Sequence, residues 1–363
     1  MTVRLWRYEW GKLWFTYKGI WLLLGFVLLK TALLCVLPEM TDARLGMSKT
    51  QYNEVMYGEA LGFVVHGEAA AEKERQIAET YAFYQSMRME DARFAEQMRR
   101  GEITNDDYWA FYQENEPVLS QINRYHTVLE IVNEKRLQFA AQQRDEGLAP
   151  PAYFYEYGWA SALTYMGWLD PLAFLIAMTL AIQMVCPEIA SGAMRVTHAT
   201  RYGRAPLFFA KLTVLTVILC VTAALSAAME LGLFTARFDL SEGAWPLYSI
   251  TPYADTRLPL SLSLSQAFVT LSVIRAAGLV LTGLFTFALA CLASGAAQTA
   301  FMGLALVVLP WLTLPEFAFT PGAWLAGRSV FLTEQRPLSA LVMGVIVLDL
   351  LGAAFWVRFG RAR

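Results

Sequence analysis

Residues 19–37 read GIWLLLGFVLLKTALLCVL, and Pro38 follows directly. This run carries one charge, Lys30, and as a helix it is long enough to cross a hydrocarbon core about 30 Å thick. Five further apolar runs lie near 169–186, 207–233, 268–291, 299–315 and 338–357. The chain is 56% hydrophobic and 17% charged, whereas soluble domains are about 25% charged. The sequence therefore predicts an all-α polytopic membrane protein with six transmembrane helices.

The basic residues predict the orientation of these spans. With the N-terminus inside, the cytoplasmic pieces are 1–18, 187–211, 292–298 and 358–363, which carry eleven basic residues and only two acids, Glu9 and Glu188. Cytoplasmic loops of membrane proteins carry this excess of lysine and arginine. We therefore expect a plasma-membrane protein with both termini cytoplasmic and residues 38–165 outside.

Residues 1–18 mix aromatic and basic side chains at helical spacing. One helix face can collect five apolar residues, Leu5, Trp6, Trp10, Leu13 and Trp14. Indole rings and cations on one helix favour the membrane interface, where they meet lipid headgroups. The segment is predicted to be an amphipathic helix lying in the cytoplasmic interface; the alternative is a cytoplasmic extension of the first span.

Residues 38–165 are expected to form an acidic, mainly helical extracytoplasmic domain. They hold 21 acidic and 12 basic residues and none of the four cysteines. Apolar residues recur at helical spacing over 77–98 and again over 119–137, which predicts a hairpin of two amphipathic helices. Gly101 is expected to end the first helix, and the acidic Asn105–Asp107 stretch is expected to begin the next element, a shorter helix near 106–114.

No chemistry of an enzyme is evident in the sequence. There is no Gly-x4-Gly-Lys-Ser/Thr phosphate loop. His66, His126 and His198 fall on both sides of the predicted membrane, which argues against a shared metal site. The basic residues follow membrane topology, so nucleic-acid binding is not indicated. We expect no catalytic residue, no metal and no cofactor bound by this chain.

The most informative segment is cytoplasmic, at 187–202 between the second and third spans. Pro187 is expected to break the span, Glu188 to favour the positive end of a short helix, and Gly192 to allow close backbone approach. A short surface helix with basic flanks can transmit force from a soluble partner; the alternative is an ordinary basic loop. The candidate coupling residues are Glu188, Ser191, Gly192, Arg195, Arg201 and Arg204.

This segment resembles the corresponding loop of ABC transporter permeases of the type-2 exporter class, the ABC-2 membrane protein family. In that family a glutamate a few residues before a glycine opens a cytoplasmic coupling helix, and an arginine and a lysine precede the next span. Glu188, Ser191–Gly192, Arg204 and Lys211 match this pattern, while Ala193 stands where a threonine is common. The large domain at 38–165 lies outside the resemblance.

The resemblance implies a division of labour between subunits. Two permease subunits, identical or different, would pair with two cytoplasmic ATP-binding subunits that hold ATP and Mg²⁺. ATP-driven closure would then press on the helix that begins near Glu188 and move a substrate outward.

Four ionisable residues lie inside predicted spans and are candidates for function by position. They are Lys30, Glu230, Arg275 and Asp349. Lys30 and Arg275 can alternatively extend outward to the interface, and Glu230 can reach the surface. Asp349 is surrounded by leucine and valine, so its charge should face protein or a water-filled cavity. Asp170–Pro171 predicts a helix start, and the apolar tract 315–337 predicts one or two short re-entrant helices.

These observations favour an export permease that moves a hydrophobic or amphipathic substrate, such as a peptide, lipid or drug-like molecule. A second hypothesis is a sensor or antimicrobial-resistance module that binds an extracellular ligand and signals without transport. A third, a membrane enzyme acting on lipid, requires a nucleophile and base that the sequence does not provide. The expected partners are an ATP-binding cassette subunit, a second permease subunit and membrane lipid.

Overall fold

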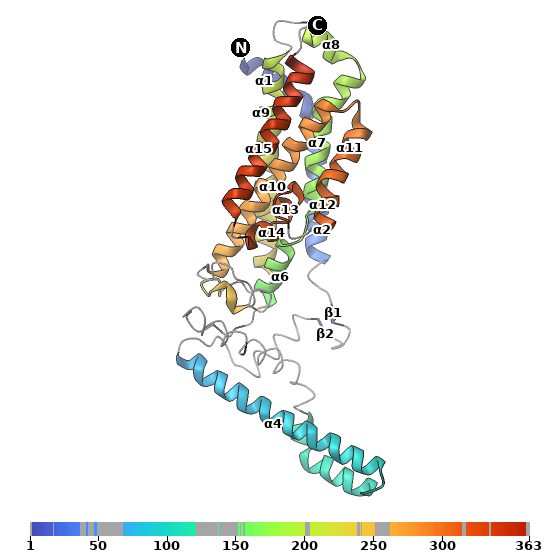
Figure 1. Ribbon diagram of the computed structural model, residues 1–363, viewed down its shortest axis with the longest axis vertical. Helices are drawn as coiled ribbons and strands as arrows, with labels where there is room; N and C mark the ends of the chain where they lie inside the picture. The colour runs from blue at the N-terminus through green and yellow to red at the C-terminus, as the bar shows by residue number, and fades with distance from the viewer. Residues whose placement is uncertain are drawn as a thin grey trace. The chain divides into compact units, whose positions relative to one another are not determined.

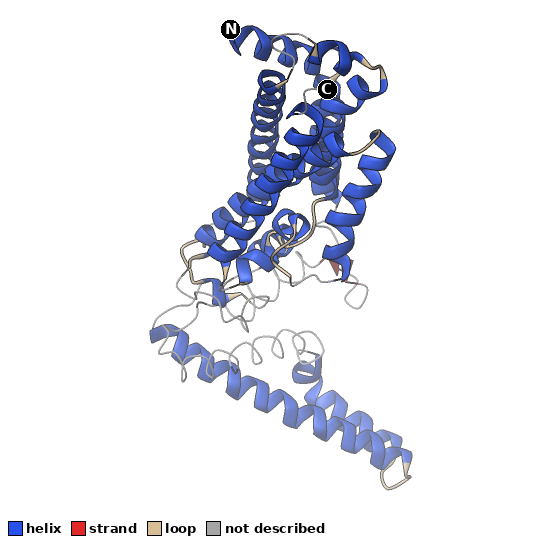
Figure 2. Cartoon of the chain, turned by 45° about the horizontal axis from the view of Figure 1, so that its top comes forward, coloured by secondary structure: helices blue, strands red, loops and turns tan. Residues whose placement is uncertain are grey.

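The computed structural model describes residues 2–16, 18–36, 41–42, 47–48, 68–120, 137, 152, 154, 157–199, 204–237, 240, 242–250, 262–313, 317–333 and 335–360. These residues are overwhelmingly helical (Figure 2). Within them, extended structure is limited to the two-residue strands β1 (Thr41–Asp42) and β2 (Met47–Ser48), which pair antiparallel, and to one isolated bridge between Pro246 and Ser263. The protein is therefore all-α, as the sequence predicts.

Among the described residues, six helical stretches are long and apolar enough to cross a membrane, which confirms the predicted number of spans. They are α2 (Gly19–Val36), α6 (Tyr157–Met166) with α7 (Pro171–Ala190), α9 (Ala205–Arg237), α10 (Leu264–Leu292), α11 (Ala296–Gly303) with the π-turn η6 (Leu304–Val308) and α12 (Leu309–Thr313), and α15 (Arg336–Phe355) with the π-turn η7 (Trp356–Gly360) (Figure 1). The second stretch begins about ten residues earlier than expected. The reason is that α6, whose Leu163 and Met166 are fully buried, packs with the bundle.

The N-terminal segment is a helix separate from the first span. It comprises α1 (Thr2–Gly11) and the π-turn η1 (Lys12–Thr16), and it ends where Lys18 adopts a φ of 57°. That backbone conformation cannot continue a helix, so the segment and the first span are not one continuous helix, while the position of the segment in the membrane interface stays a prediction. The predicted apolar face is confirmed, but it faces protein: Leu13 is fully buried, and Trp6, Trp10 and Trp14 pack against the core.

Two short helices occupy the apolar tract before the last span. They are α13 (Pro321–Ala326), in which every residue is buried, and α14 (Arg328–Leu332). The close approach of α13 to α10 requires Gly278, because a Cβ there would lie 2.4 Å from the carbonyl carbon of Trp324. The predicted pair of short helices is thus present, while their re-entry into a membrane stays a prediction.

Residues 39–160 and 241–264 form a compact unit of their own, apart from the helical bundle of residues 1–38, 161–240 and 265–363. The boundary therefore falls near 160 rather than 165, and the unit includes a second segment that the sequence did not indicate. Within that unit, the Ala152 amide donates to the hydroxyl of Ser249, which joins the two segments. The 3₁₀ turn η4 (Leu247–Ser249) belongs to the second segment.

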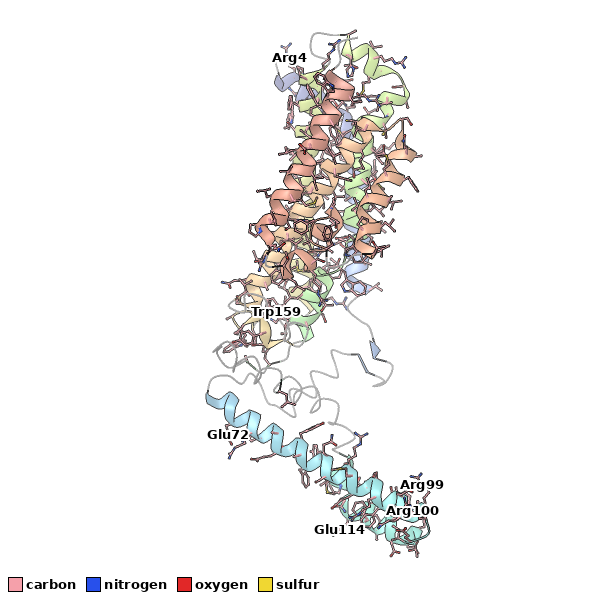
Figure 3. All side chains as sticks on the ribbon, in the orientation of Figure 1. Arg4, Glu72, Arg99, Arg100, Glu114 and Trp159 are labelled. Carbon is pink, nitrogen blue, oxygen red and sulfur yellow. The ribbon has the colours of Figure 1, made fainter. Side chains whose placement is uncertain are left out.

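A helical hairpin lies in this second unit. Helix α4 (Glu68–Arg99) ends at Arg99, and Arg100 follows in the turn (Figure 3). A helix over 105–120 comes after Gly101, whose φ is 71°. Thr104 caps the new helix by exchanging hydrogen bonds with Asp107, so the cap is Thr104 rather than the Asn105–Asp107 stretch. The rings of Phe94 and Phe111 stack 4.2 Å apart across the hairpin.

The prediction of a separate short helix near 106–114 is wrong, because the helix over 105–120 is continuous. Its sequence contains only Pro117 as an interruption, and the structure accommodates that residue. Most of the predicted helix over 119–137 lies outside the described residues.

Candidate functional site

Two clusters of buried charged side chains lie in the helical bundle. The first, here called the tetrad, joins Lys30 of α2, Asp170 at the start of α7, Glu230 of α9 and Arg275 of α10. Each of the four is at most 6% exposed. Lys30 bonds to Asp170 and, at 2.6 Å, to Glu230, while Arg275 lies 3.0 Å from Glu230 and 3.3 Å from Asp170. Two cations thus alternate with two carboxylates, and the site is formally neutral.

The tetrad brings together three of the residues that the sequence singled out for their position within spans. The interpretation that Lys30 and Arg275 extend to the interface is wrong, because both are buried and paired. Glu230 likewise does not reach the surface. An unpaired charge in this environment would cost several kcal/mol, whereas each tetrad member has two oppositely charged neighbours. Tyr165 lies with its ring about 5.5 Å from both cations.

Asp170 has two functions that one carboxylate can perform together. Its Oδ1 accepts hydrogen bonds from the amides of Leu172 and Ala173, so it caps α7 as the Asp–Pro sequence predicts. Its Oδ2 contacts Lys30 and Arg275. Sequence reasoning missed this second function, because the four members come from four helices and no spacing along the chain relates them.

The second cluster, here called the corner cluster, lies where α7 turns towards α9. The ammonium of Lys211 lies 2.8 Å from Glu9 of α1, 2.8 Å from Glu188 of α7 and 2.9 Å from the carbonyl of Met184. Lys12 of η1 also bonds to Glu188. Lys211 is fully buried, and Glu9 and Glu188 are 1% and 5% exposed. The corner cluster therefore ties the N-terminal helix to α7 and α9 through charged hydrogen bonds.

The predicted place of Glu188 requires a correction. Helix α7 continues through Pro187 to Ala190, so Glu188 lies in its last turn and does not begin a new helix. Proline removes one backbone hydrogen bond, but near a helix end this loss is small and the ring remains exposed. Because Glu188 is buried among cations, it cannot itself form a contact surface for a soluble partner. One of its oxygens, Oε2, is buried without a hydrogen-bond partner among the described residues.

A short helix does follow, as the sequence indicates, but it begins later. Ser191 caps the end of α7, Gly192 has a φ of 71°, and α8 spans Ala193–His198. A Cβ at Gly192 would meet no atom within 4 Å, so this glycine serves the left-handed turn and not a close approach.

The remaining candidates of this segment are placed as follows. Ser191 and Arg195 are exposed, and Arg204 is half-buried in the turn before α9. Arg201 lies outside the described residues. The exposed surface next to the corner cluster is therefore formed by α8 and the residues around it, while Glu188 lies in the interior.

The two clusters are separated by about the thickness of a hydrocarbon core. Asp170 and Glu188 lie 18 positions apart on α7, and Lys211 and Glu230 lie 19 positions apart on α9. At 1.5 Å per residue, the two pairs span about 27–29 Å, against about 30 Å for the membrane interior. Charged clusters thus bound an apolar layer at its two edges, and the tetrad is not at the middle of the bundle.

Asp349 does not join either cluster. It lies on an exposed face of α15 and has no hydrogen bond or ion pair with the part of the chain that the structure describes. Within a single chain its charge therefore does not face protein, and the alternative of a water-filled cavity stays a prediction. The reason is that α15 packs through another face, on which Met343 and Val347 are buried.

His198 ends α8 in a basic environment near η7, and its ring lies 5.1 Å from that of Phe359. Burial, followed by the cations Arg204 and Arg358, lowers the pKa of His198 below its ordinary value of 6.5. Among the described residues, no three histidine, cysteine or acidic side chains gather as metal ligands require. Arg4 projects from α1 at the same end of the bundle (Figure 3).

Comparisons with known proteins do not assign this site to a family. No protein-family model, no curated protein and no solved structure matches the chain. What the structure establishes is therefore a bundle of six apolar helices, typical of a membrane-spanning protein, with two buried charge clusters that bound its apolar layer.

Proposed function

We propose that the chain is the membrane-spanning permease subunit of an ATP-driven exporter. It moves a hydrophobic or amphipathic substrate outward, and a separate cytoplasmic subunit binds and hydrolyses ATP. The N- and C-terminal segments and α8 face the cytosol, and residues 38–165 face the outside. A second permease subunit completes the transport path.

The corner cluster is the observation that carries this proposal. A partner that presses on the exposed face of α8, where Val196 is 73% exposed, displaces the end of α7. Glu188 is bonded to Lys211 of α9 and to Lys12, and Lys211 in turn is bonded to Glu9 of α1. The displacement therefore acts on three helices together, because buried charged groups resist separation.

This mechanism gives Glu188 a role different from the one that the sequence resemblance implies. The glutamate transmits movement inside the protein, and the contact with the ATP-binding subunit belongs to the exposed residues Ser191, Arg195 and Val196. Oε2 of Glu188, which has no hydrogen-bond partner in the described part of the chain, leaves one acceptor available to a new donor when the corner cluster moves. The cluster thus has the capacity to exchange partners between two states.

Copurification tests the proposal most directly. The full chain, isolated in mild detergent from its native membranes, should carry an ATP-binding subunit. Repeated isolation of the chain without such a subunit would contradict the exporter function.

The role of the corner is tested in the reconstituted complex. Glu188→Gln leaves Lys211 with Glu9 as its carboxylate and removes the carboxylate that Lys12 contacts, so transport per ATP hydrolysed should fall while ATP hydrolysis persists. Lys18→Gln, which removes an exposed cation near the same end, should leave that ratio unchanged. An unchanged ratio in Glu188→Gln would remove the coupling role from the corner cluster.

The sensor hypothesis remains the second candidate, and the separate compact unit of residues 39–160 and 241–264 favours it. A protein that binds a ligand in this unit and only signals would not change the amount of any substrate across the membrane. Vesicle uptake that depends on ATP distinguishes the two functions, because a sensor predicts none.

A further inference from the structure

A cavity of about 820 Å³ lies at the tetrad end of the bundle, outside both charge clusters. Its lining includes Gly167 and Trp168 from the turn between α6 and α7, Trp311 of α12, and Arg328, Ser329 and Leu332 of α14. The labels of α6, α12 and α14 locate this region in Figure 1. Its volume falls within the range of about 300–1,000 Å³ that is typical of small-molecule sites.

The cavity contains one charged group that has no partner in the described part of the chain. Arg328 is exposed, and no described residue forms an ion pair or hydrogen bond with its guanidinium. The neighbouring Arg336 differs, because its Nε donates to the carbonyl of Thr333 and its guanidinium covers the ring of Phe331. Arg275 is paired with Asp170 and Glu230 in the tetrad.

The stem of Arg328 is held in a defined place. A Cβ on Gly167 would lie 3.1 Å from both Cβ and Cδ of Arg328, so the glycine backbone forms a surface on which the stem rests. Gly167 is fixed by amide hydrogen bonds to the carbonyls of Leu163 and Thr164. The cationic group therefore extends from a supported stem beside the cavity.

The rest of the lining is suited to an apolar body. Trp168, which is 65% exposed, and Trp311 contribute two indoles, and Leu332 adds an aliphatic side chain. Trp168 lies two residues before Asp170, at the edge of the apolar layer that the two clusters bound. Tryptophan and arginine are favoured at this depth because headgroups and acyl chains meet there.

From this geometry we propose that the cavity binds an amphipathic molecule with one anionic head, a phosphate or a carboxylate, and an apolar chain. The guanidinium of Arg328 donates hydrogen bonds to the head, which a planar fork does well for either group. The apolar chain lies against the two indoles and extends towards the hydrocarbon layer. The proposal narrows the substrate class of the proposed exporter, and in that respect it rests on that function.

Two sources share this head-and-chain chemistry, namely a phospholipid of the membrane and an exported molecule. Both would present an anion at the same depth, and the site would recognise either. The experiment therefore first tests whether the site prefers an anionic head, and then whether the bound molecule comes from the membrane or arrives separately.

The test uses the full chain purified in a neutral detergent and titrated with two single-chain probes by native mass spectrometry. Lysophosphatidylglycerol carries a net negative head, and lysophosphatidylcholine of the same chain length is zwitterionic. The wild-type protein should prefer the anionic probe by about tenfold, the size expected of one charge-assisted contact. Arg328→Gln should abolish the preference, and Arg336→Gln, the matched control, should retain it.

A second variant separates the apolar part of the site from the anionic part. Trp168→Ala removes one indole from the lining, so both probes should bind more weakly while the preference for the anion persists. Equal binding of the two probes to the wild type, or a preference that survives in Arg328→Gln, would overturn the proposal.

The source follows from what the purified protein already carries. A phospholipid that copurifies with the wild type and is lost in Arg328→Gln identifies the membrane. A cavity that is empty after purification and is filled by the added probe identifies a molecule that arrives separately. Because binding in detergent needs no ATP-binding subunit, its failure would reject the site alone, whereas failure of copurification would reject the exporter alone.

Discussion

Replacement of Lys30 by methionine tests whether the tetrad holds the bundle together. Lys30 is fully buried, and its ammonium lies 2.6 Å from Glu230 and also contacts Asp170. At an effective dielectric constant of about 20, charges 2.6 Å apart attract by about 6 kcal/mol, and desolvation of both groups offsets part of this. Loss of one partner from a buried pair typically costs about 3–5 kcal/mol, because the remaining charge is uncompensated. We expect Lys30→Met to lower the free energy of unfolding by this amount.

The double variant Lys30→Met/Glu230→Gln makes the argument specific to charge. It leaves Asp170 paired with Arg275, so the site is neutral again and much of the lost stability should return. Each single variant, in contrast, leaves three charges of which one is unmatched. The loss in free energy of unfolding of the double variant should therefore be smaller than the sum of the losses of the two single variants, by more than about 1 kcal/mol.

The assay is unfolding of the purified chain by SDS in mixed micelles, followed by helical circular dichroism. Leu28→Met is the matched control, because Leu28 is 70% exposed on the same helix and the change should cost less than about 0.5 kcal/mol. Additive effects of Lys30→Met and Glu230→Gln would refute the reasoning, since they would mean that the four charges do not act as one group.

Three further predictions concern other parts of the molecule. Because burial lowers the pKa of His198, the folded state binds a proton less well than the unfolded chain. The stability of the protein should therefore fall as the pH decreases from about 6.5 through the lowered pKa. Thermal melts at pH 7.5 and about 5.5 should show a smaller loss of stability in His198→Gln than in the wild type. Gly278→Ala should destabilise the bundle by about 1–3 kcal/mol, because the added Cβ forces α13 away. Gly352→Ala is the control and should be neutral or stabilising, because no atom lies within 4 Å of the added Cβ. Equal effects of the two variants in SDS unfolding would contradict this packing. A cysteine in place of Gln85 on α4 should react with an impermeant maleimide added to intact cells, and labelling only after lysis would invert the predicted topology.

Much of the fold follows from patterns that are local in the sequence. Each span is a continuous apolar run, so its existence can be predicted without any partner, and the six helical stretches agree with that prediction. The cap at Asp170 is equally local, since one carboxylate followed by proline suffices to begin a helix. The extent of α6 was not predictable in this way, because its burial depends on residues far away in the chain.

The site was less predictable, because its members meet only in three dimensions. Position within an apolar run identified Lys30, Glu230 and Arg275 individually, but no local signal shows that they share one cluster. Glu9 is one of two acids among eleven basic residues in the predicted cytoplasmic pieces, and the structure shows it 1% exposed and bonded to Lys211. A useful signal was present nonetheless, since a lone acid on the apolar face of an amphipathic helix requires a buried cation nearby.

The distance between the clusters explains why α7 and α9 each carry one charged member of a cluster near either end. Helix α7 has a carboxylate at each end, Asp170 and Glu188, and α9 has Lys211 at one end and Glu230 at the other. Each charge is compensated within its own cluster, so neither helix needs to place an unpaired charge in the apolar layer between. A sliding movement of α7 against α9 by one helical turn, about 5.4 Å, would break ion pairs in both clusters at once. Rigid tilting about either cluster breaks fewer contacts. In the exporter that we propose, a cycle that preserves one cluster while the other exchanges partners is therefore the movement that this arrangement favours.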